Sequence, residues 1–322
     1  MHGLSRGTLD LAALLSAALG RPLYDGERLA VAVSGGPDSL GLLLLAQATY
    51  AGRVLALTVD HGLRPAAARE ASGVAALCAA RGVPHATLPW VGTKPVTNLQ
   101  AEARRARYTL MRDVCAQNGI GVLITAHHAD DQAETLLMRL ARGSGAGLAG
   151  IRVRRPLGAG VTLLRPLLGA RRSVLAAIVA DAGIAPLLDP TNDDPHYDRT
   201  HARRLLAQTG WIDAMQLAAS AAHLAETETA LDWVTERAWA GRTGFDDAGL
   251  SLDTAGLPAA LVRRLVVRAI HHFVPDAALR GADITRLIGR LDSGGAATLA
   301  GVKASGGMPW RFTRAPPRRQ IG

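Results

Sequence analysis

A six-residue segment, Ser34 to Ser39, has the composition of a loop that binds phosphate groups. It reads Ser-Gly-Gly-Pro-Asp-Ser and lies between an apolar run, 29–33, and a helix-like stretch, 40–48. Its glycines let successive backbone N–H groups face one anion, its serines add hydroxyl donors, and the start of the following helix adds partial positive charge. Asp38 can cap that helix or hold a magnesium ion that bridges phosphates. An ordinary strand-to-helix turn is the simpler alternative.

This segment differs from the two better-known phosphate-binding signatures. It contains neither Gly-x-x-x-x-Gly-Lys-[Ser/Thr] nor Gly-x-Gly-x-x-Gly, so it is not a Walker loop or a dinucleotide loop. It resembles the pyrophosphate loop of the N-type ATP pyrophosphatases. Those enzymes split ATP between the α and β phosphates and adenylate a substrate.

A second segment, 125–135, concentrates carboxylates after another apolar run, 122–124. It reads Thr-Ala-His-His-Ala-Asp-Asp-Gln-Ala-Glu-Thr. Asp131 and Glu134 are three residues apart, so on a helix they share a face and form one acidic pocket suited to a cation, with Asp130 near the helix start. The alternative is that these carboxylates only complement the helix dipole. The two histidines, taken singly, are expected to be ordinary hydrogen-bonded residues.

Several such blocks occur in one order, and together they resemble tRNA(Ile)-lysidine synthetase. The first four are Ser-Gly-Gly-Pro-Asp-Ser at 34–39, Val-Asp-His-Gly-Leu-Arg at 59–64, Ala-Arg-Arg-Ala-Arg-Tyr at 103–108 and His-His-Ala-Asp-Asp-Gln-Ala-Glu-Thr at 127–135. Further matches lie within 142–151, 165–168 and 189–193. The similarity covers at least 28–206, and a run of ordered blocks is more diagnostic than any single one.

The resemblance implies an enzyme that ligates L-lysine to C2 of the wobble cytidine, position 34, in the CAU anticodon of tRNA(Ile), which then reads AUA. The cytidine O2 would attack the α-phosphate of ATP and release pyrophosphate, and the lysine ε-amine would then displace AMP. ATP and Mg²⁺ are the implied cofactors. A cytoplasmic location, the absence of a membrane partner and a homodimer would fit such an enzyme.

Residue roles carry over from the same resemblance. ATP would contact Ser34, Gly35, Gly36, Pro37, Asp38, Ser39 and His61. The lysine pocket would be lined by Asp38, Asp131 and Glu134, with Asp38 also the metal ligand, and catalysis would involve these three and Arg107. The tRNA would contact Arg199 and Arg203. For any single arginine, a solvated basic face is the alternative.

The chain departs from the family pattern in two places. Relatives usually carry Arg-Asn-x-Ile-Arg where this chain has Arg-Thr-His-Ala-Arg at 199–203, so both arginines are kept and the asparagine is not. Many relatives also carry two C-terminal domains, whereas this chain ends soon after one is completed. We therefore expect a short form of the family.

The charge of the chain favours a polyanionic partner. Its 322 residues carry a formal net charge of +9 and give a pI near 10.6. Lys94 and Lys303 are the only lysines, so arginine supplies the excess. Guanidinium groups suit phosphates and stack on bases, although genomic base composition can produce the same bias.

Cysteine usage and the N-terminal region both fit a reducing cytoplasm. Cys78 and Cys115 are too few and too far apart in sequence for a disulfide framework or a zinc site. Their separation also argues against tRNA thiolation, where related enzymes use paired cysteines. The apolar run 11–20 is too short to span a membrane and is expected to be a packed helix.

The periodicity of apolar residues predicts an α/β fold. Strands near 29–33, 54–59, 85–89 and 121–125 alternate with helical patterns near 39–50, 66–81, 98–117 and 130–141. This indicates a doubly wound parallel sheet, and the resemblance makes it adenine nucleotide alpha hydrolase-like. We expect a catalytic domain over 1–210, a linker helix over 211–243, and a smaller, mainly helical C-terminal domain over 244–322 that contacts tRNA and has a strand near 297–302.

Two other functions stay open from the sequence. One is another ATP-dependent adenylating enzyme, such as a tRNA thiolase or an amidotransferase-type synthetase. The other is a non-catalytic RNA-binding protein with an inactive nucleotide fold. Basic residues near the C-terminus are expected to grip tRNA phosphates: Lys303, Arg311, Arg314, Arg318 and Arg319.

Overall fold

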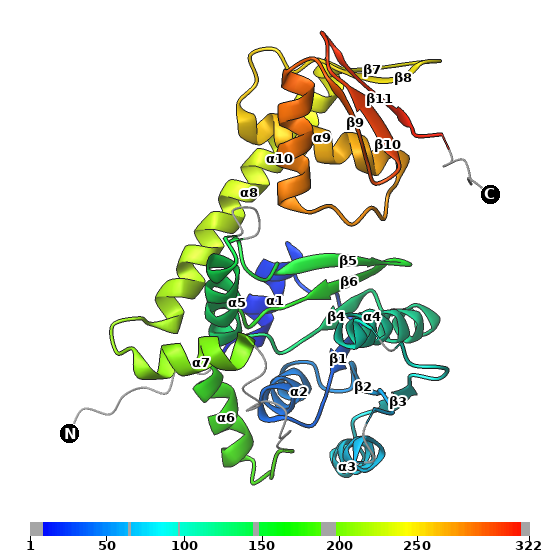
Figure 1. The fold of residues 1–322 in the computed structure, drawn as a ribbon. Coiled ribbons are helices and arrows are strands. Elements are labelled where there is room, and N and C mark those ends of the chain that lie inside the picture. The colour runs from blue at the N-terminus through cyan, green and yellow to red at the C-terminus, as the bar shows by residue number, and fades with distance from the viewer. Residues whose placement is uncertain (1–8, 64–65, 96, 144–147, 188–197, 317–322) are drawn as a thin grey trace. The chain divides into compact units, whose positions relative to one another are not determined.

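The structure is a computed structural model that divides the chain into two compact units, Met1–Ala225 and Glu226–Gly322 (Figure 1). The division lies inside α8 (Ala214–Arg242), where the sequence predicts one long helix. Both units contain buried apolar clusters of their own. The residues that the structure describes are 9–63, 66–95, 97–143, 148–187 and 198–316.

The first unit is built on a six-stranded sheet with the order β3-β2-β1-β4-β6-β5. All neighbouring strands run parallel except β5, which pairs antiparallel with β6 at the edge. The strands are β1 (Leu29–Ala32), β2 (Val54–Asp60), β3 (His85–Pro89), β4 (Val122–Ile124), β5 (Arg154–Gly158) and β6 (Val161–Leu164). The four strands that the sequence predicts are confirmed, and β6 is the parallel strand that it missed.

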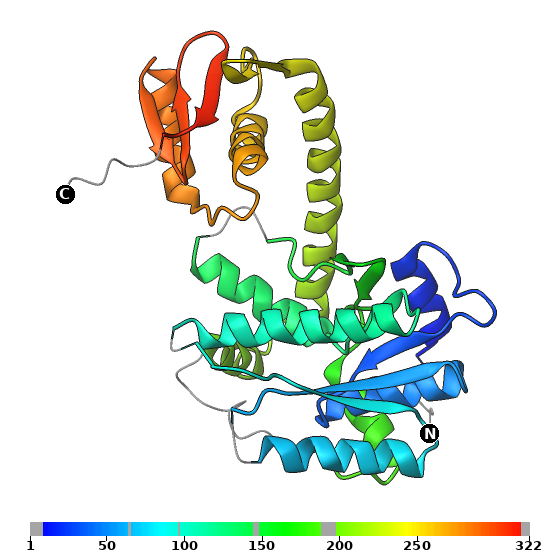
Figure 2. The ribbon, with the colours of Figure 1, turned by 90° about the vertical axis from the view of Figure 1, so that its right-hand side faces the viewer.

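Helices cover both faces of this sheet (Figure 2). They are α1 (Leu11–Leu19), α2 (Pro37–Thr49), α3 (Ala67–Ala80), α4 (Leu99–Gln117), α5 (Ala129–Ala141), α6 (Arg172–Asp181) and α7 (Asp198–Gln208), followed by α8. The four predicted helices have bounds within two residues of α2, α3, α4 and α5. The apolar run 11–20 is α1, which Asp10 caps and Gly20 ends.

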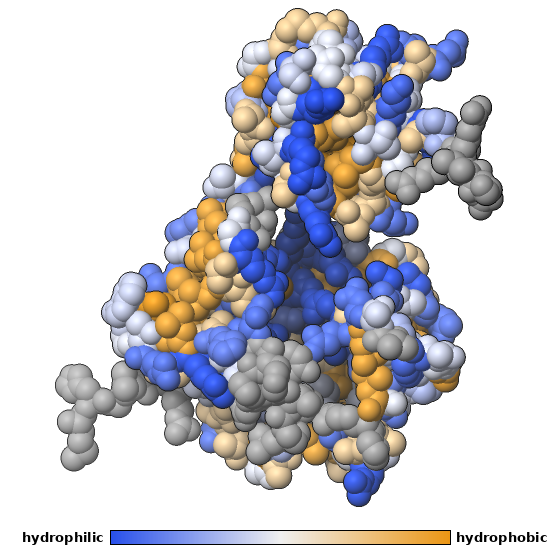
Figure 3. All heavy atoms as spheres, viewed as in Figure 1, coloured by the Kyte–Doolittle hydropathy of each residue, from blue (hydrophilic) through white to orange (hydrophobic). Residues whose placement is uncertain are grey.

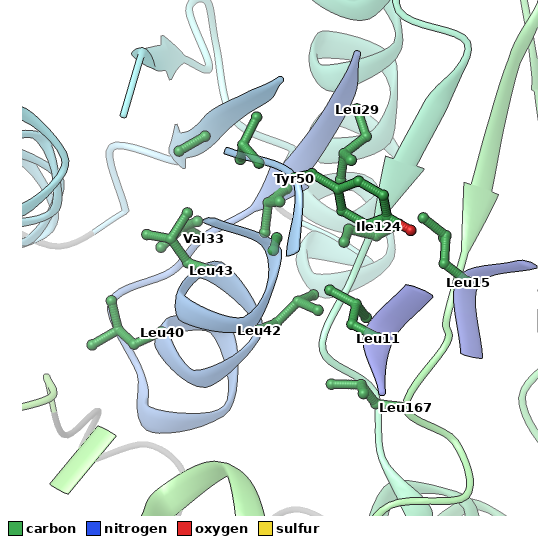
Figure 4. Packing of buried hydrophobic residues seen from close by; sticks show 14 of the residues in the cluster. Leu11, Leu15, Leu29, Val33, Leu40, Leu42, Leu43, Tyr50, Ile124 and Leu167 are labelled. Carbon is green, nitrogen blue, oxygen red and sulfur yellow. The ribbon is translucent and has the colours of Figure 1, made fainter. Parts of the chain in front are cut away.

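Alternate residues along each strand explain how two cores form. Leu29 and Val31 face the cluster that includes α1 and α2 (Figure 4), whereas Ala30 faces the cluster that includes Tyr108 and Met111 of α4. Successive side chains of a strand point to opposite faces, so strands buried on both sides read as continuous apolar runs. The expected doubly wound α/β fold is therefore confirmed.

The parallel arrangement brings four separate segments to one edge of the sheet. The segments that follow β1, β2, β4 and β6 begin with Val33, His61, Thr125 and Arg165. Open α/β sheets bind ligands at the carboxyl ends of their strands. The candidate site residues are therefore expected to lie along this edge of the sheet.

The second unit pairs helices with an antiparallel sheet of order β7-β8-β11-β10-β9. Its elements after α8 are β7 (Thr243–Asp246), β8 (Gly249–Leu252), α9 (Ala259–Phe273), α10 (Gly281–Asp292), β9 (Ala296–Leu299), β10 (Val302–Ser305) and β11 (Trp310–Arg314). The single strand expected near 297–302 is instead the hairpin of β9 and β10. It turns at Ala300 and Gly301, which have φ angles of 48° and 80°.

Two further observations concern the chain as a whole. No helix of the described residues is both long and apolar enough to cross a membrane. In the basic C-terminal stretch, Lys303, Arg311 and Arg314 lie on β10 and β11, and Arg311 pairs with Asp246. Arg318 and Arg319 lie outside the described residues.

Candidate active site

The segment 34–39, called the phosphate loop below, is a tight turn between β1 and α2. Ser39 Oγ accepts a hydrogen bond from the Ser34 N–H at 3.1 Å and donates one to the Gly36 carbonyl at 3.0 Å. Pro37 occupies the first helical position, where its missing N–H would have had no partner. The other N–H groups of this first turn have no acceptors within the helix and can bind an anion.

Gly35 is required by the backbone of the phosphate loop. Its φ angle is +85°, and a Cβ atom at this position would lie 2.5 Å from Leu187 Cδ1. The Leu187 N–H also donates to the Gly35 carbonyl at 2.9 Å. A side chain at position 35 would therefore strain the backbone and displace the segment that covers the loop.

His128, and not Asp130, caps helix α5. The His128 N–H donates to Asp131 Oδ2 at 3.0 Å, and His128 Nδ1 lies 3.4 Å from Asp130 Oδ2. Asp130 turns instead toward α6, where its Oδ2 accepts from the Arg172 N–H at 2.8 Å. The expectation that Asp130 lies near the helix start is correct, and His128 is the N-cap residue.

His128 is also a buried cation between carboxylates. Its side chain is 3% exposed, and Nε2 lies 3.5 Å from Asp38 Oδ2 and 3.6 Å from Asp131 Oδ2. Burial by itself lowers the pKa of His128, but the contacts with Asp130 and Asp38 raise it to about 9. The imidazolium joins the phosphate loop to α5, a role that the sequence reading did not assign to it.

Asp38 is held as a carboxylate with one oxygen unused. Burial opposes its ionisation, but His128 and Arg172 keep the pKa of Asp38 below its ordinary value. Its Oδ1 atom is buried without a hydrogen-bond partner and lies 3.5 Å from Arg172 Nε. The N-cap of α2 is Gly36, and no side chain donates or accepts at that cap. Of the two roles expected for Asp38, helix capping is therefore wrong.

Asp131 and Glu134 share one face of α5, as their spacing predicts, and two arginines of α7 neutralise them. Arg199 bonds to both carboxylates, and Arg203 Nε donates to Glu134 Oε1 at 2.9 Å. The Glu134 side chain is only 3% exposed. Burial raises the pKa of Asp131 although His128 and Arg199 act against this.

Arg107 and His61 lie apart from these carboxylates. Burial, followed by the charge of Arg107, lowers the pKa of His61 to about 4, so the imidazole is neutral at neutral pH. Its Nδ1 is buried without a hydrogen-bond partner, and its ring lies edge-on to Trp90 at 5.9 Å. Arg107 forms no ion pair within the described part of the chain, and burial lowers its pKa.

The structure therefore joins most of the expected residues into one network. Asp38, Asp131 and Glu134 are linked to the phosphate loop through His128 and Arg199, and these carboxylates, together with Asp130, are called the acidic cluster below. Figure 3 shows hydrophilic side chains gathered on this face between α4 and α5. The residues that the sequence reading missed are His128 and Arg172. The paired histidines before the first carboxylate were the only sequence signal for His128.

Some of the expected features can be placed and others cannot. Cys78 and Cys115 are both buried free thiols, and they pack in core clusters on opposite faces of the sheet. They cannot act as a pair. The motif residues Arg64, 144–147 and 189–193 lie outside the described residues.

Comparisons with known proteins agree with this arrangement. Residues 10–210 match the PP-loop domain family. The chain is 48% identical over 297 residues to the tRNA(Ile)-lysidine synthase of Zymomonas mobilis subsp. mobilis, covering 91% of this chain and 90% of that relative. The protein of the same name from Novosphingobium aromaticivorans is 46% identical over 305 residues, with the same shares covered.

A solved structure shares the fold at lower sequence identity. The U34-tRNA thiolase NcsA from Methanococcus maripaludis, with its [4Fe-4S] cluster, superimposes with a TM-score of 0.55 at 17% identity. The match covers 68% of this chain and 78% of that one. At this identity the match shows a shared arrangement of strands and helices and does not indicate a shared function.

Proposed function

The chain belongs to the tRNA(Ile)-lysidine synthase family, and we propose that it ligates L-lysine to C2 of the wobble cytidine in the CAU anticodon of tRNA(Ile). ATP would adenylate the cytidine, and AMP and pyrophosphate would be released. The modified tRNA would then read AUA. The observation that carries this proposal is the buried carboxylate pair, Asp131 and Glu134, linked by His128 to the phosphate loop.

The first step forms a bond between the cytidine O2 and the α-phosphorus and breaks the bond to pyrophosphate. Charge develops on the phosphoryl oxygens, so the site must supply fixed donors. The phosphate loop has the first-turn N–H groups of α2 and the hydroxyl of Ser34, whereas the Ser39 hydroxyl donates to the Gly36 carbonyl. His61, neutral and with an unused Nδ1, suits a neighbour of the nucleotide.

Asp38 is the residue that fits a magnesium ion. Its Oδ1 atom lacks a hydrogen-bond partner, and Mg²⁺ in nucleotide sites is bound by one or two carboxylates together with phosphate oxygens. When bound, the ion would neutralise charge on the pyrophosphate leaving group.

The second step needs a lysine amine that has lost its proton. The ε-amine would attack C2, form the C–N bond and release AMP with the cytidine O2. Asp131 and Glu134 would bind the cationic ammonium. Because Arg199 pairs with both carboxylates, lysine must displace that guanidinium to reach them. Burial raises the pKa of Asp131, so this carboxylate would accept the proton.

The remaining roles rest on the family. Arg107 would act beside the nucleotide, and Arg199 and Arg203 would reach tRNA once lysine has replaced them on the carboxylates. The first unit would be catalytic, and the second would contact tRNA through the basic residues of β10 and β11. A cytoplasmic location and a homodimer complete the proposal.

The direct test is ATP-dependent incorporation of labelled lysine into a tRNA(Ile) transcript with a CAU anticodon. We expect incorporation with stoichiometric pyrophosphate release, and its loss in an Asp131→Asn/Glu134→Gln double variant. Asp113→Asn is the matched control, because Asp113 is an exposed carboxylate of α4 paired with Arg112. Pyrophosphate release that needs a sulfur donor or ammonia in place of lysine would reject lysidine synthesis.

A further inference from the structure

A second charged group of side chains lies at the same sheet edge, on the face covered by α4. Arg104 and Tyr108 belong to α4, Arg155 belongs to β5, and Arg165 directly follows β6. The Arg155 and Arg104 guanidinium carbons lie 4.8 Å and 5.2 Å from the centre of the Tyr108 ring. We call Arg104, Arg155 and Arg165 the arginine cluster.

Arg165 is a buried charge that has no anionic partner among the residues the structure describes. Its residue is 3% exposed, its Nη1 donates to the Arg152 carbonyl at 2.6 Å, and its Nε has no acceptor. Burial lowers its pKa, Tyr108 acts in the opposite direction, and Arg104 and Arg155 lower it further. Burying a guanidinium that contacts only neutral groups costs free energy. The buried Arg165 side chain therefore points to an anionic ligand that is not part of this chain.

The whole cluster lacks compensating carboxylates. Within the described residues no acidic side chain pairs with any of its three arginines, whereas arginines nearby, such as Arg105 and Arg112, have carboxylate partners. The pKa of the nearby His127 is lowered to about 3, first by burial and then by the positive charges of Arg165 and Arg104. The site is therefore positive, and no acidic side chain of the described residues would have to be displaced by an anion.

We propose that the arginine cluster binds a backbone phosphate of the RNA strand next to the reacting nucleotide. Guanidinium forks match phosphate oxygens in pairs. The Leu164 carbonyl accepts from the Thr125 N–H at 3.1 Å, so Arg165 begins beside the segment that leads to the acidic cluster. The ring of Tyr108 supports the guanidinium groups of Arg104 and Arg155. The proposal rests on the proposed RNA substrate.

The phosphates of ATP are the other anions that could bind the arginine cluster. They are the less suitable ligand, because the phosphate loop already offers donors for them. That loop already provides backbone and hydroxyl donors for them. Binding measurements can separate the two sources, because ATP and a CAU anticodon stem-loop RNA can be titrated one at a time without lysine or turnover.

The experiment compares the wild-type chain with Arg104→Gln, Arg155→Gln and their double variant. We expect each single change to weaken stem-loop binding several-fold and the double change to reduce the slope of log affinity against log salt by about 0.7 to 0.9 per lost phosphate contact. ATP affinity should stay the same. Arg165→Lys, which keeps the charge and loses the fork, should weaken RNA binding without unfolding the chain.

Arg154→Gln is the matched control. Arg154 neighbours Arg155 on β5 but points to the other face of the sheet, where its Nη1 donates to the Leu19 carbonyl at 3.2 Å. The Arg154→Gln variant should bind RNA nearly as tightly as the wild-type chain does. Unchanged RNA binding in the double variant, or a fall in ATP affinity instead, would overturn the proposal even if wild-type protein incorporates lysine. A wild-type chain that binds no RNA would reject the proposed function as well.

Discussion

The acidic cluster and the arginine cluster lie at the same edge of one sheet but differ in how their charges are balanced. Every carboxylate of the acidic cluster contacts a cation of the chain, from His128, Arg172, Arg199 or Arg203. The arginine cluster has no such counter-ions within the described residues. Cations of the chain therefore neutralise the acidic cluster, whereas no described carboxylate neutralises the arginine cluster.

This difference has consequences for binding. A cationic substrate at the acidic cluster replaces an existing ion pair, so its affinity is the difference between two similar interactions. An anion at the arginine cluster forms new pairs and releases counter-ions, so its affinity should depend strongly on salt. Changes to either cluster can separate these two behaviours.

The largest expected effect separates the two half-reactions. Asp38→Asn should impair tRNA-dependent pyrophosphate release, because Asp38 lies on the phosphate loop and its Oδ1 has no hydrogen-bond partner. Asp131→Asn should leave that release largely intact and reduce lysine transfer by about 10²-fold or more, because Asp131 is the proposed proton acceptor. Parallel assays of labelled pyrophosphate and labelled lysine check this. Equal losses of both activities in both variants would contradict the separate roles.

The second effect concerns the stability of the acidic cluster. Arg199→Gln removes the partner of Asp131 and Glu134 and should cost about 2 kcal/mol of unfolding free energy, discounted because the Arg199 side chain is 45% exposed. Denaturant unfolding measures this. Arg105→Gln, which breaks an exposed pair with Glu102, should cost well under 1 kcal/mol. Similar costs for the two changes would show that the buried pairing adds no stability.

The third effect tests the loop that adjoins the acidic cluster. Gly35→Ala should weaken ATP binding about tenfold, because a left-handed φ costs an alanine about 1 to 2 kcal/mol and its Cβ would contact Leu187. Calorimetric titration with ATP measures the change. Gly52→Ala is the control, since Gly52 also has a positive φ but a Cβ there would meet no atom within 4 Å. It should lower stability and leave ATP affinity unchanged.

The smallest effect is a pH dependence caused by His127, whose pKa is lowered first by burial and then by the charges of Arg165 and Arg104. The pKa of His127 is about 3 in the folded chain, below its ordinary value of 6.5. Below pH 6.5 the unfolded chain takes up a proton that the folded chain refuses, so stability falls as the pH is lowered from 6.5 toward 3. His127 should contribute a loss of about 1 kcal/mol near pH 5.5.

Unfolding curves at pH 5.5 and 7 compare the wild type with His127→Gln, in which this contribution should disappear. The exposed His201 provides the control variant His201→Gln, which should keep the wild-type dependence. A pH dependence unchanged by His127→Gln would mean that this imidazole is not held neutral in the fold.

Local sequence was sufficient for most of the first unit. Alternating apolar runs and helical periods located four strands and four helices, since these patterns reflect burial on a sheet face or a helix stripe. The family resemblance is confirmed by relatives that match 91% of the chain. The second sheet was largely missed because β7, β8, β9 and β10 have four residues each, too short for a clear period.

The sequence by itself determined the phosphate loop, the shared face of Asp131 and Glu134 and the excess of arginine. Each depends on neighbours within one turn or on composition. Only the tertiary structure decided that His128 joins Asp38 to Asp131, that Arg199 occupies the acidic cluster, and that Arg165 is buried without a counter-ion. Those partners come from separate helices and strands, and charge pairing depends on distances that only the packed fold sets.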